Sequence, residues 1–331
     1  MNSNNSASLR VFVTGATGVV GRRVVPLLLR DGHRVTVLAR SADQHARFAK
    51  QGIASYETTM FNRDALVRAL DGQQVVINLA SHMPSSSFRM MFRSAWREND
   101  RVRREGSANI LHAAHTAGID TYIQESFAPV YEDGGRNWIN EHHPLRPVAY
   151  NATVLDAEAS ANEFTAADKR GIVVRFGGLY GPDAFHVREL VRMVRMGWAS
   201  LPGSADAYWS SISHDDAATA VVAAINAPAG TYNVVDDQPL TRSEFFNALA
   251  DAFALTHPRM LPAWTMKLMG SAGELLGRSQ RIANQKLRAA TGWAPSMPSA
   301  REGFRAIATE WAACTGVRCP QRFVGHGSPN T

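Results

Sequence analysis

Short β-branched runs alternate with amphipathic stretches through the first half of this 331-residue chain. The runs that are typical of buried strands are "LRVFVTG", "HRVTVLAR", "QQVVINLAS", "DTYIQES" and "GIVVRFGGLYG". Helix-like stretches such as "VVGRRVVPLLLRDG" and "SANILHAAHTAGI" lie between them. Strands rich in valine and isoleucine that are separated by helices predict right-handed crossovers and a parallel sheet covered on both faces. The predicted fold class is therefore α/β, with a doubly wound parallel sheet.

A glycine-rich segment, "TGATGVVG", follows the first predicted strand and opens a helix. Glycine permits a sharp turn and a close approach of the backbone to a pyrophosphate, and the helix N-terminus supplies amide groups and a partial positive charge. The segment thus predicts a Rossmann-type dinucleotide site. The expected contacts in this segment come from Thr14, Gly15, Thr17, Gly18, Val19, Val20, Gly21 and Arg22.

The end of the second predicted strand indicates which dinucleotide binds. An acidic residue there would bond the ribose 2'-hydroxyl and repel a 2'-phosphate, but this chain has Arg40 followed by Ser41. A guanidinium suits a phosphate dianion. Arg22 and Arg23 can reinforce Arg40 or point to solvent. We therefore predict NADP(H) rather than NAD(H) as the cofactor.

The regular alternation ends after "YGPDAF". Residues 1–182 are predicted to form the dinucleotide-binding Rossmann domain, with residues 1–8 as a loose tail. Residues 183–331 are predicted to form a smaller, mostly helical substrate-binding lobe, from which residues 208–235 pack back onto the first domain.

Composition limits the partners of this chain. The formal net charge is +6, but the arginines are spread over many segments and no basic-aromatic recognition motif occurs, so we expect no nucleic-acid partner. No uncharged apolar run approaches the roughly 18 residues of a membrane span, and "MNSNNSAS" lacks the apolar stretch of a signal peptide. The sequence thus predicts a cytoplasmic protein with a small-molecule substrate and no membrane partner, and it leaves a homodimer open. Cys314 and Cys319 are expected to be ordinary thiols without a metal.

Several segments, in a fixed order, resemble the extended branch of the short-chain dehydrogenase/reductase family, of the NAD-dependent epimerase/dehydratase type. They are "VFVTGATGVVG", "VVINLAS", "YIQESFAPVY", the helix expected from Tyr150, "RFGGLYGP", "SISHDDAATAVVAAI", "TYNVVDDQPLT" and "LRAATGWAP". In that family a Ser or Thr bonds the substrate oxygen, a Tyr exchanges its proton, and a Lys four residues later holds the nicotinamide ribose and lowers the Tyr pKa. The resemblance implies that Tyr150 is catalytic and contacts the cofactor. It also implies cofactor contacts from Leu79, Ala80 and Ser81.

The chain departs from the family pattern at the lysine. The fourth residue after Tyr150 is Val154, and none of the seven tyrosines is followed by lysine at that spacing. On a helix, a four-residue spacing would place the two side chains on one face. We therefore interpret the lysine as absent from this chain.

The chain also departs at the end of the strand "DTYIQES". Phe127 stands where the family has its Ser or Thr, four residues before the tyrosine of "VY". The neighbouring Ser126 is the remaining candidate for a catalytic hydroxyl. Successive side chains of a strand point to opposite faces, so Ser126 can reach the substrate only if the backbone has already left the strand. Ala128 and Pro129 replace the Asp and Glu of the dehydratases, which disfavours dehydration by that route.

Three further polar residues have two interpretations each. Glu125 is either a half-buried acid with a raised pKa or a carboxylate bonded to loop amides. His142 and His143, in the loop before Tyr150, either reach the pocket or stay exposed.

The missing lysine bears on the direction of the reaction. An isolated tyrosine has a pKa of about 10, so only about one molecule in a thousand is ionised at neutral pH. Oxidation of an alcohol needs that phenolate as a base, whereas reduction of a carbonyl needs the abundant neutral phenol. The sequence therefore predicts an NADPH-dependent oxidoreductase that reduces a carbonyl or an activated double bond.

The predicted substrate is a small hydrophobic metabolite, because the segment expected to line the pocket is apolar and aromatic. It contains Met193, Met196, Trp198, Tyr208 and Trp209. Arg175 and Arg192 can alternatively meet an anionic group. Two other functions stay open: a redox-neutral epimerase or isomerase of the same family, and a non-catalytic NADP(H)-binding regulator, against which the retained Tyr150 argues.

Overall fold

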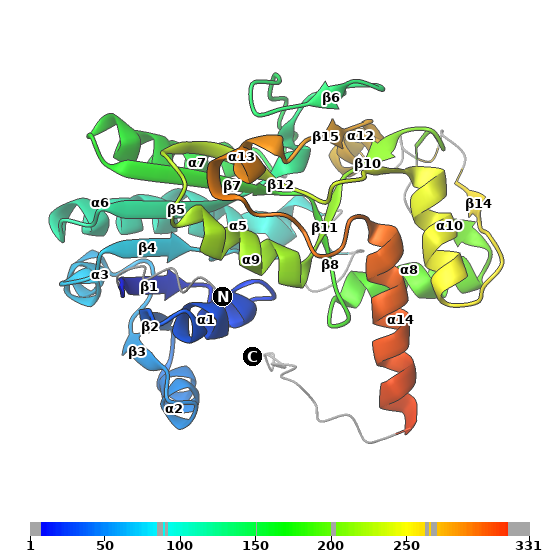
Figure 1. Cartoon of the computed structure of the whole chain (residues 1–331). Helices are drawn as coiled ribbons and strands as arrows, with labels where there is room; N and C mark the ends of the chain where they lie inside the picture. Colours follow the sequence, from blue (N-terminus) through cyan, green and yellow to red (C-terminus); the bar gives the residue numbers. More distant parts are fainter. Residues whose placement is uncertain are drawn as a thin grey trace.

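A seven-stranded parallel sheet lies at the centre of the computed structural model, which describes residues 8–84, 89, 92–149, 151–199, 203–261, 265 and 270–316 (Figure 1). The strands follow the order β12-β7-β5-β4-β1-β2-β3. Their bounds are β1 (Arg10–Thr14), β2 (Arg34–Ala39), β3 (Ala54–Glu57), β4 (Val75–Asn78), β5 (Thr121–Phe127), β7 (Arg170–Phe176) and β12 (Gly230–Val234). All six neighbouring pairs are parallel. The predicted doubly wound sheet is confirmed.

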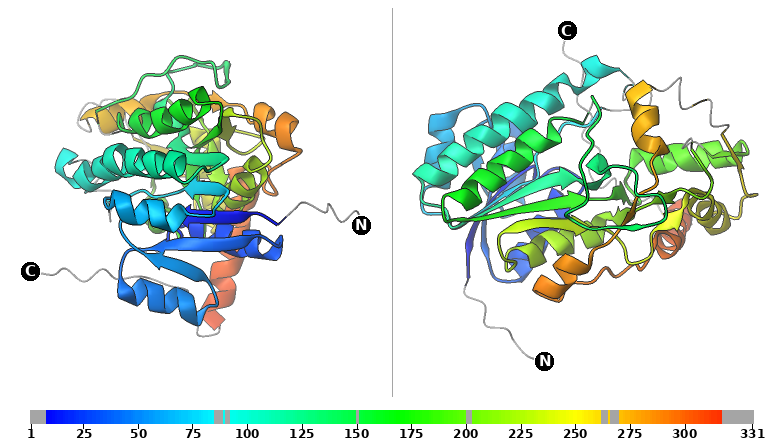
Figure 2. Two further views of the ribbon diagram at one scale, coloured as in Figure 1. Left: turned by 90° about the vertical axis from the view of Figure 1, so that its left-hand side faces the viewer. Right: turned by 90° about the horizontal axis from the view of Figure 1, so that it is seen from above.

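Helices cover both faces of this sheet, as the two further views in Figure 2 show. Side chains of β1 alternate between two hydrophobic cores: Val11 and Val13 lie in one and Phe12 in the other. The first core includes α1 (Gly21–Arg30) and α9 (His214–Ala224), which pack against each other. The second includes α3 (Arg63–Leu70), α6 (Ser107–Thr116) and α7 (Val154–Ala166). Because both faces are buried, these strands read as near-continuous apolar runs in the sequence.

The order of the strands reverses between β1 and β4. The chain runs from β1 outward through β2 and β3, then returns to β4 on the other side of β1 and continues through β5 and β7. The carboxyl ends of β1 and β4 meet in register, with Thr14 opposite Asn78. Ligands of open α/β sheets bind at such a switch point, outside the carboxyl ends of the strands.

A smaller lobe extends beyond the carboxyl edge of the sheet (Figure 1). Its core lies between α8 (Phe185–Arg195), α10 (Arg242–Ala252) and α14 (Ala300–Gly316). Helix α13 (Gln285–Thr291) packs back onto β12 and α9 of the sheet, whereas α12 (Gly270–Gly277) and four two-stranded pairs complete the described structure at this edge. These pairs are β6 (Trp138–Ile139) with β15 (Arg281–Ile282), β8 (Gly178–Tyr180) with β11 (Ser211–Ser213), β9 (Trp198–Ala199) with β14 (Arg259–Met260), and β10 (Tyr208–Trp209) with β13 (Leu240–Thr241).

None of the helices in the described ranges is both long and apolar enough to cross a membrane.

Candidate active site

Two of the three loop glycines are required by the loop itself. Gly15 has a φ of +69°, and a Cβ there would lie 2.4 Å from the Leu79 carbonyl oxygen. A Cβ on Gly21 would lie 2.2 Å from the Gly15 carbonyl oxygen. Side chains at these positions would collide with backbone, so the loop folds this way only with glycine at both.

Gly18 differs from its two neighbours. It is exposed, and a Cβ on it would meet only one heavy atom within 4 Å, the Gly15 carbonyl oxygen at 3.1 Å. Apart from this one tight contact the position is open in the protein alone, three residues before α1 begins. A pyrophosphate that approached this backbone would fill the space that a side chain would take. The loop fits a dinucleotide.

The end of β4 lies beside this loop, with the Leu79 backbone against Gly15. The Thr14 hydroxyl donates to Asn78 Oδ1 over 2.5 Å, and the Ala80 amide donates to the same oxygen over 3.3 Å. Thr14 and Leu79 are buried, Ala80 is half-buried, and Ser81 is exposed. Of the predicted cofactor contacts, Ser81 and Thr17 are thus exposed, and Ala80 is half-buried.

The end of β2 presents a cation. Arg40 is exposed, and in the described part of the chain its guanidinium makes no hydrogen bond or ion pair; its backbone amide donates to Gln44 Oε1 over 2.9 Å. The Ser41 hydroxyl accepts from the Gln44 amide and caps α2 (Ala42–Lys50). The capping bond fixes the backbone just after Arg40, at the carboxyl end of β2.

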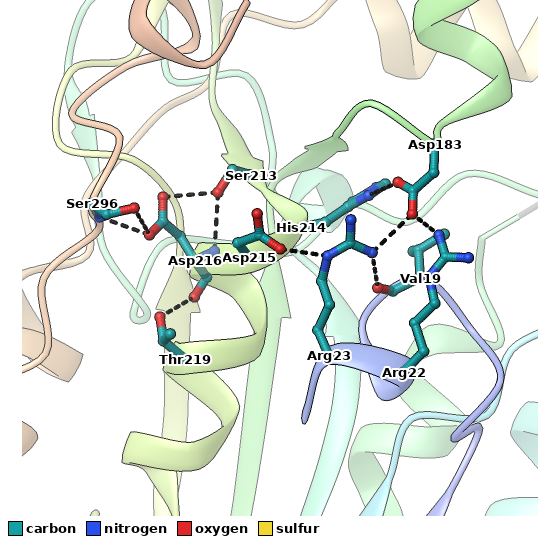
Figure 3. A network of polar contacts seen from close by, with 10 residues as sticks. All are labelled: Val19, Arg22, Arg23, Asp183, Ser213, His214, Asp215, Asp216, Thr219 and Ser296. Atoms are coloured by element: carbon teal, nitrogen blue, oxygen red, sulfur yellow. Dashed lines mark hydrogen bonds and ion pairs between the residues drawn. The ribbon is translucent and has the colours of Figure 1, made fainter. Parts of the chain in front are cut away.

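Arg22 and Arg23 were predicted either to reinforce Arg40 or to point to solvent, but in this structure both form ion pairs within the protein. Figure 3 shows both turned toward Asp183, which follows β8: Arg22 forms an ion pair with Asp183, and Arg23 Nη1 lies 3.0 Å from it. Arg23 Nε also lies 2.5 Å from Asp215 Oδ1. His214 Nδ1 also lies within hydrogen-bonding distance of Asp183, 2.8 Å from its Oδ1 (Figure 3). No sequence signal joined these distant segments, because only the fold places α1 beside β8 and α9.

The environment of His214 keeps its ring neutral. Burial, followed by the nearby charges of Arg23 and Arg22, lowers the pKa of His214 to about 3. A neutral ring beside a carboxylate donates through Nδ1 to Asp183. This network ties the first turn of α1 to the start of the lobe.

Ser126 does not meet the condition for a catalytic hydroxyl. Strand β5 stays regular through Phe127, so Ser126 and Phe127 point to opposite faces. Ser126 is 1% exposed, and its hydroxyl donates to Glu158 of α7. The expectation that Ser126 reaches the substrate is therefore not supported by the geometry, and the side chain is turned into the layer between the sheet and α7.

A buried polar network holds Ser126 there. Arg175 binds both carboxylate oxygens of Glu158, over 2.7 and 2.6 Å, and donates to the Tyr131 hydroxyl over 2.8 Å. Tyr131 donates in turn to Asn233 over 2.7 Å. Burial raises the pKa of Tyr131 to about 12, so this tyrosine stays neutral. The alternative role of Arg175 as an anion contact is wrong, because its guanidinium is occupied within the fold.

Tyr150 lies outside the described residues, and its catalytic role stays a prediction. The helix that was expected to start there begins at Val154, after a turn over residues 151–153 in which the Val154 amide donates to the Asn151 carbonyl over 3.1 Å. Val154 is 0% exposed. The first turn of α7 thus offers an aliphatic side chain to the core and no amino group to the site.

Glu125 is half-buried, as one of its two predictions has it, and its carboxylate pairs with an arginine. Its Oε1 lies 3.2 Å from Arg103 Nη2, in an ion pair that is almost fully buried. His142 is exposed, and the half-buried His143 packs edge-on against the Tyr131 ring at 6.1 Å between centroids. Sequence reasoning missed Arg103, because only the fold brings this arginine to the end of β5.

The predicted pocket wall is divided between two environments. Met196 is 63% exposed and Trp198 is also exposed, on the lobe surface. Tyr208 and Trp209 are half-buried beside the guanidinium groups of Arg281 and Arg242, at 4.9 and 5.6 Å. A continuous apolar wall is not formed by these residues.

Comparison with known proteins shows which family this chain is similar to. The NAD dependent epimerase/dehydratase family matches residues 11–235. The chain is 30% identical over 305 residues to the 3-diazoavenalumate denitrifying reductase of a Streptomyces species, covering 89% of this chain and 99% of that protein. It is 24% identical to the 2-alkyl-3-oxoalkanoate reductase of Shewanella oneidensis, over 83% of this chain and 73% of that protein.

Two solved structures share the fold. Human epimerase family protein SDR39U1, solved with NADPH, has a TM-score of 0.74 at 22% identity and covers 91% of this chain and 99% of its own. UDP-glucose 4-epimerase of Thermotoga maritima, solved with UDP-glucose, has a TM-score of 0.74 at 18% identity and covers 93% and 100%. The protein therefore belongs to the NAD-dependent epimerase/dehydratase family, within the extended short-chain dehydrogenases/reductases.

Proposed function

We propose that this protein is an NADPH-dependent reductase that acts on a carbonyl, or on an activated double bond, of a small hydrophobic metabolite. The observation that carries the proposal is the buried Val154 at the first turn of α7. It leaves no amino group four residues after Tyr150, so nothing at that position lowers the tyrosine pKa. A tyrosine with an ordinary pKa of about 10 donates a proton well at neutral pH and accepts one poorly.

The residues at the carboxyl edge of the sheet fit the cofactor. Gly18 and the N-terminus of α1 would meet the pyrophosphate, and Arg40 would meet a 2'-phosphate. The bound nicotinamide would supply a hydride. The protein would position the substrate against the nicotinamide and would supply a neutral acid and a cation at the ribose.

The names of three relatives support reduction. The two reductases described above are joined by 4-hydroxy-2-methyl-3-oxo-4-farnesyl-3,4-dihydroquinoline-1-oxide ketoreductase of Stigmatella aurantiaca, which is 27% identical over 254 residues. The names of two of them state that they act on oxo compounds. This agrees with a carbonyl as the acceptor.

A second candidate is reductive removal of nitrogen from a diazo compound. It is favoured by the likeness to the denitrifying reductase, which extends over 99% of that protein. When a hydride replaces a leaving group, no proton has to be delivered to a substrate oxygen. A site without the lysine, and with Ser126 turned away from it, suits such a reaction.

The test has two stages. Calorimetry first measures the dissociation constants of NADPH and NADH. The NADPH-loaded protein is then offered a panel of ketones, aldehydes, enones and aryl diazo compounds, and the loss of NADPH absorbance is followed. Turnover of ketones or aldehydes supports the first candidate, and turnover of the diazo compounds alone supports the second. Nicotinamide that stays tightly bound through purification, without net oxidation of NADPH by any compound, would contradict both and indicate a redox-neutral epimerase.

A further inference from the structure

A π-helical turn interrupts the long helix that follows β4. Helix α5 (Arg97–Arg101), the π turn η2 (Val102–Gly106) and α6 form one continuous helical stretch, since the residues at both junctions keep helical backbone angles. π turns inside α-helices are frequent at functional sites, because they re-aim side chains. Here the turn carries Arg103, which follows Asn99 by four residues. The two side chains therefore share one face of the helix.

The contacts of this face place it above the ends of β4 and β5. The His82 amide, four residues after β4 ends, donates to Asn99 Oδ1 over 2.9 Å. Arg103 Nη2 lies 3.2 Å from Glu125 Oε1 near the end of β5. In this sheet Arg40 marks the adenosine end of a bound dinucleotide, on the β2 side of the switch point. The nicotinamide end then extends toward β4 and β5, which brings the reacting atoms to the Asn99–Arg103 face.

Each of these two side chains has a buried nitrogen donor for which the described structure provides no hydrogen-bond acceptor. Asn99 is 0% exposed and Arg103 is 5% exposed. Within the described structure, Asn99 Nδ2 and Arg103 Nε have no hydrogen-bond partner. A buried N–H group left unpaired loses the hydrogen bond it made to water and costs stability, so most such groups in native proteins are paired. Two such unpaired donors on one helix face indicate that a bound ligand supplies the acceptor.

The neighbouring segments are fixed to the same helix. Thr153, just before α7, donates to Asp100 Oδ1 over 2.9 Å, and Arg104 Nε lies 2.7 Å from Asp156 Oδ2. A third donor without a partner in the described structure, Nδ2 of the buried Asn151, lies in the turn that precedes α7. The donors are thus held on a rigid frame, which is the condition for stabilising charge that develops during a reaction.

We propose that Asn99 and Arg103 donate hydrogen bonds to the carbonyl oxygen of the substrate and stabilise the negative charge that develops on it. The inference rests on the proposed function, and it selects a ketone or aldehyde over a carbon–carbon double bond or a diazo group. As the carbonyl carbon accepts the hydride of NADPH, the π electron pair moves to the oxygen, which then takes a proton from the neutral acid to give the alcohol. Glu125 balances the charge of Arg103 and holds its guanidinium so that Nε stays available.

The test uses 4-nitrophenol as a coloured probe, with the protein saturated with NADP+. Its phenolate mimics the charged oxygen, and the two ionisation states absorb differently. The unmodified protein should bind the phenolate in preference to the phenol, which lowers the apparent pKa of the bound probe. Arg103→Lys keeps the charge beside Glu125 and removes Nε–H, and Asn99→Asp keeps the acceptor for the His82 amide and removes the Nδ2 donor. Each should weaken phenolate binding about 10-fold to 100-fold, since a hydrogen bond to a charged oxygen is lost and, in Asn99→Asp, a carboxylate is added beside the anion.

Arg97→Lys is the matched control, because it changes an exposed arginine of the same helix that takes no part in this frame. It should leave the affinity for the probe unchanged. Equal affinity in the parent, Arg103→Lys and Asn99→Asp, or no binding of the phenolate by the parent, would overturn the proposal. Thermal melts check each variant, and if Arg103→Lys does not fold, Asn99→Asp, which is nearly isosteric, decides alone.

Calorimetry with NADPH on the same variants distinguishes the substrate from the cofactor as the acceptor. The proposal predicts that NADPH affinity is unchanged in both variants. Weaker NADPH binding with intact phenolate binding would show that the donors hold the nicotinamide, and it would overturn the proposal. If the parent binds the phenolate through these two residues yet oxidises NADPH with no carbonyl compound, the oxygen site stands and the proposed function fails.

Discussion

The two halves of the carboxyl edge of the sheet are built differently. The adenosine half, formed by the loop from Gly15 to Gly21 and by Arg40, keeps the glycine spacing of its family, and its ligand-facing positions, Gly18 and Arg40, are exposed. The nicotinamide half, formed by the ends of β4 and β5, helix α5–η2 and the start of α7, departs from the family pattern. Ser126 donates to Glu158, the first helical position of α7 is the buried Val154, and Arg103 brings a buried charge that the motifs did not predict.

This contrast indicates that dinucleotide binding and catalysis place different demands on the sequence. A dinucleotide is held mainly by backbone amides and a helix N-terminus, so its site requires glycine at few positions and tolerates other changes. Proton and hydride transfer depend on a few side chains at defined positions. A chain of this family could therefore keep a dinucleotide site while its catalytic side chains change, which is the difference that the following experiments test.

The largest expected effect lies in the nicotinamide half. Tyr150→Phe should lower the rate of NADPH-dependent reduction about 100-fold to 10,000-fold, the usual contribution of a positioned general acid. Ser126→Ala is the comparison: it should lower the free energy of unfolding by about 1 kcal/mol through its lost bond to Glu158 and leave the rate intact. Steady-state rates and urea unfolding measure both. Full activity in Tyr150→Phe would mean that the proton comes from elsewhere, with Glu125 and His143 next to be changed.

In the adenosine half, Gly18→Val should abolish the rise in melting temperature that NADPH causes, while the protein without ligand melts almost as before. The added side chain points into the open space that the pyrophosphate needs. Gly21→Val is the contrasting variant, because its Cβ would lie 2.2 Å from the Gly15 carbonyl oxygen and should destabilise the ligand-free fold. Thermal melts with and without NADPH separate the two. A retained NADPH shift in Gly18→Val would show that the loop holds no pyrophosphate.

A smaller effect is expected at the ribose. Arg40→Asp should reverse a preference for NADPH over NADH, because repulsion replaces a charge-assisted contact worth roughly 1.5 to 3 kcal/mol, or about one to two decades in affinity. Arg47→Asp, an exposed change of the same charge on α2, should leave the preference as it is. Calorimetry gives both dissociation constants. Equal binding of the two cofactors by the parent would remove Arg40 from this role.

The smallest effect concerns the Asp183 network. The folded pKa of His214 lies at about 3, below the unfolded value of about 6.5, so the unfolded chain binds more protons as the pH falls. Stability is therefore fully present above pH 6.5 and is lost progressively toward pH 3. Between pH 7 and pH 5 the loss attributable to His214 should be about 2 kcal/mol. Urea unfolding should show a smaller loss for His214→Gln, whereas the exposed His142→Gln should behave like the parent.

The strands and the glycine loop of the adenosine half could be predicted from the sequence, while the cofactor contacts there stay predictions. Runs of valine and isoleucine define the strands, and glycine spacing and the residue at the end of β2 are local signals. The nicotinamide half depends on register instead. Ser126 meets Glu158 and Arg175 only because β5 pairs with β7 under α7, and Arg103 reaches Glu125 only through a π turn that no residue pattern announced. The start of α7 at Val154, after the expected Tyr150, likewise follows from tertiary packing.

The central claim is that the tyrosine works as a neutral acid with an ordinary pKa. The most direct test is a pair of pH-rate profiles, one for reduction with NADPH and one for oxidation of the product alcohol with NADP+. We predict that reduction is independent of pH around neutrality, while oxidation rises about tenfold per pH unit toward a pKa of about 10. An oxidation rate that already levels off near pH 7 would show that a group other than the missing lysine lowers the tyrosine pKa, and it would contradict this account.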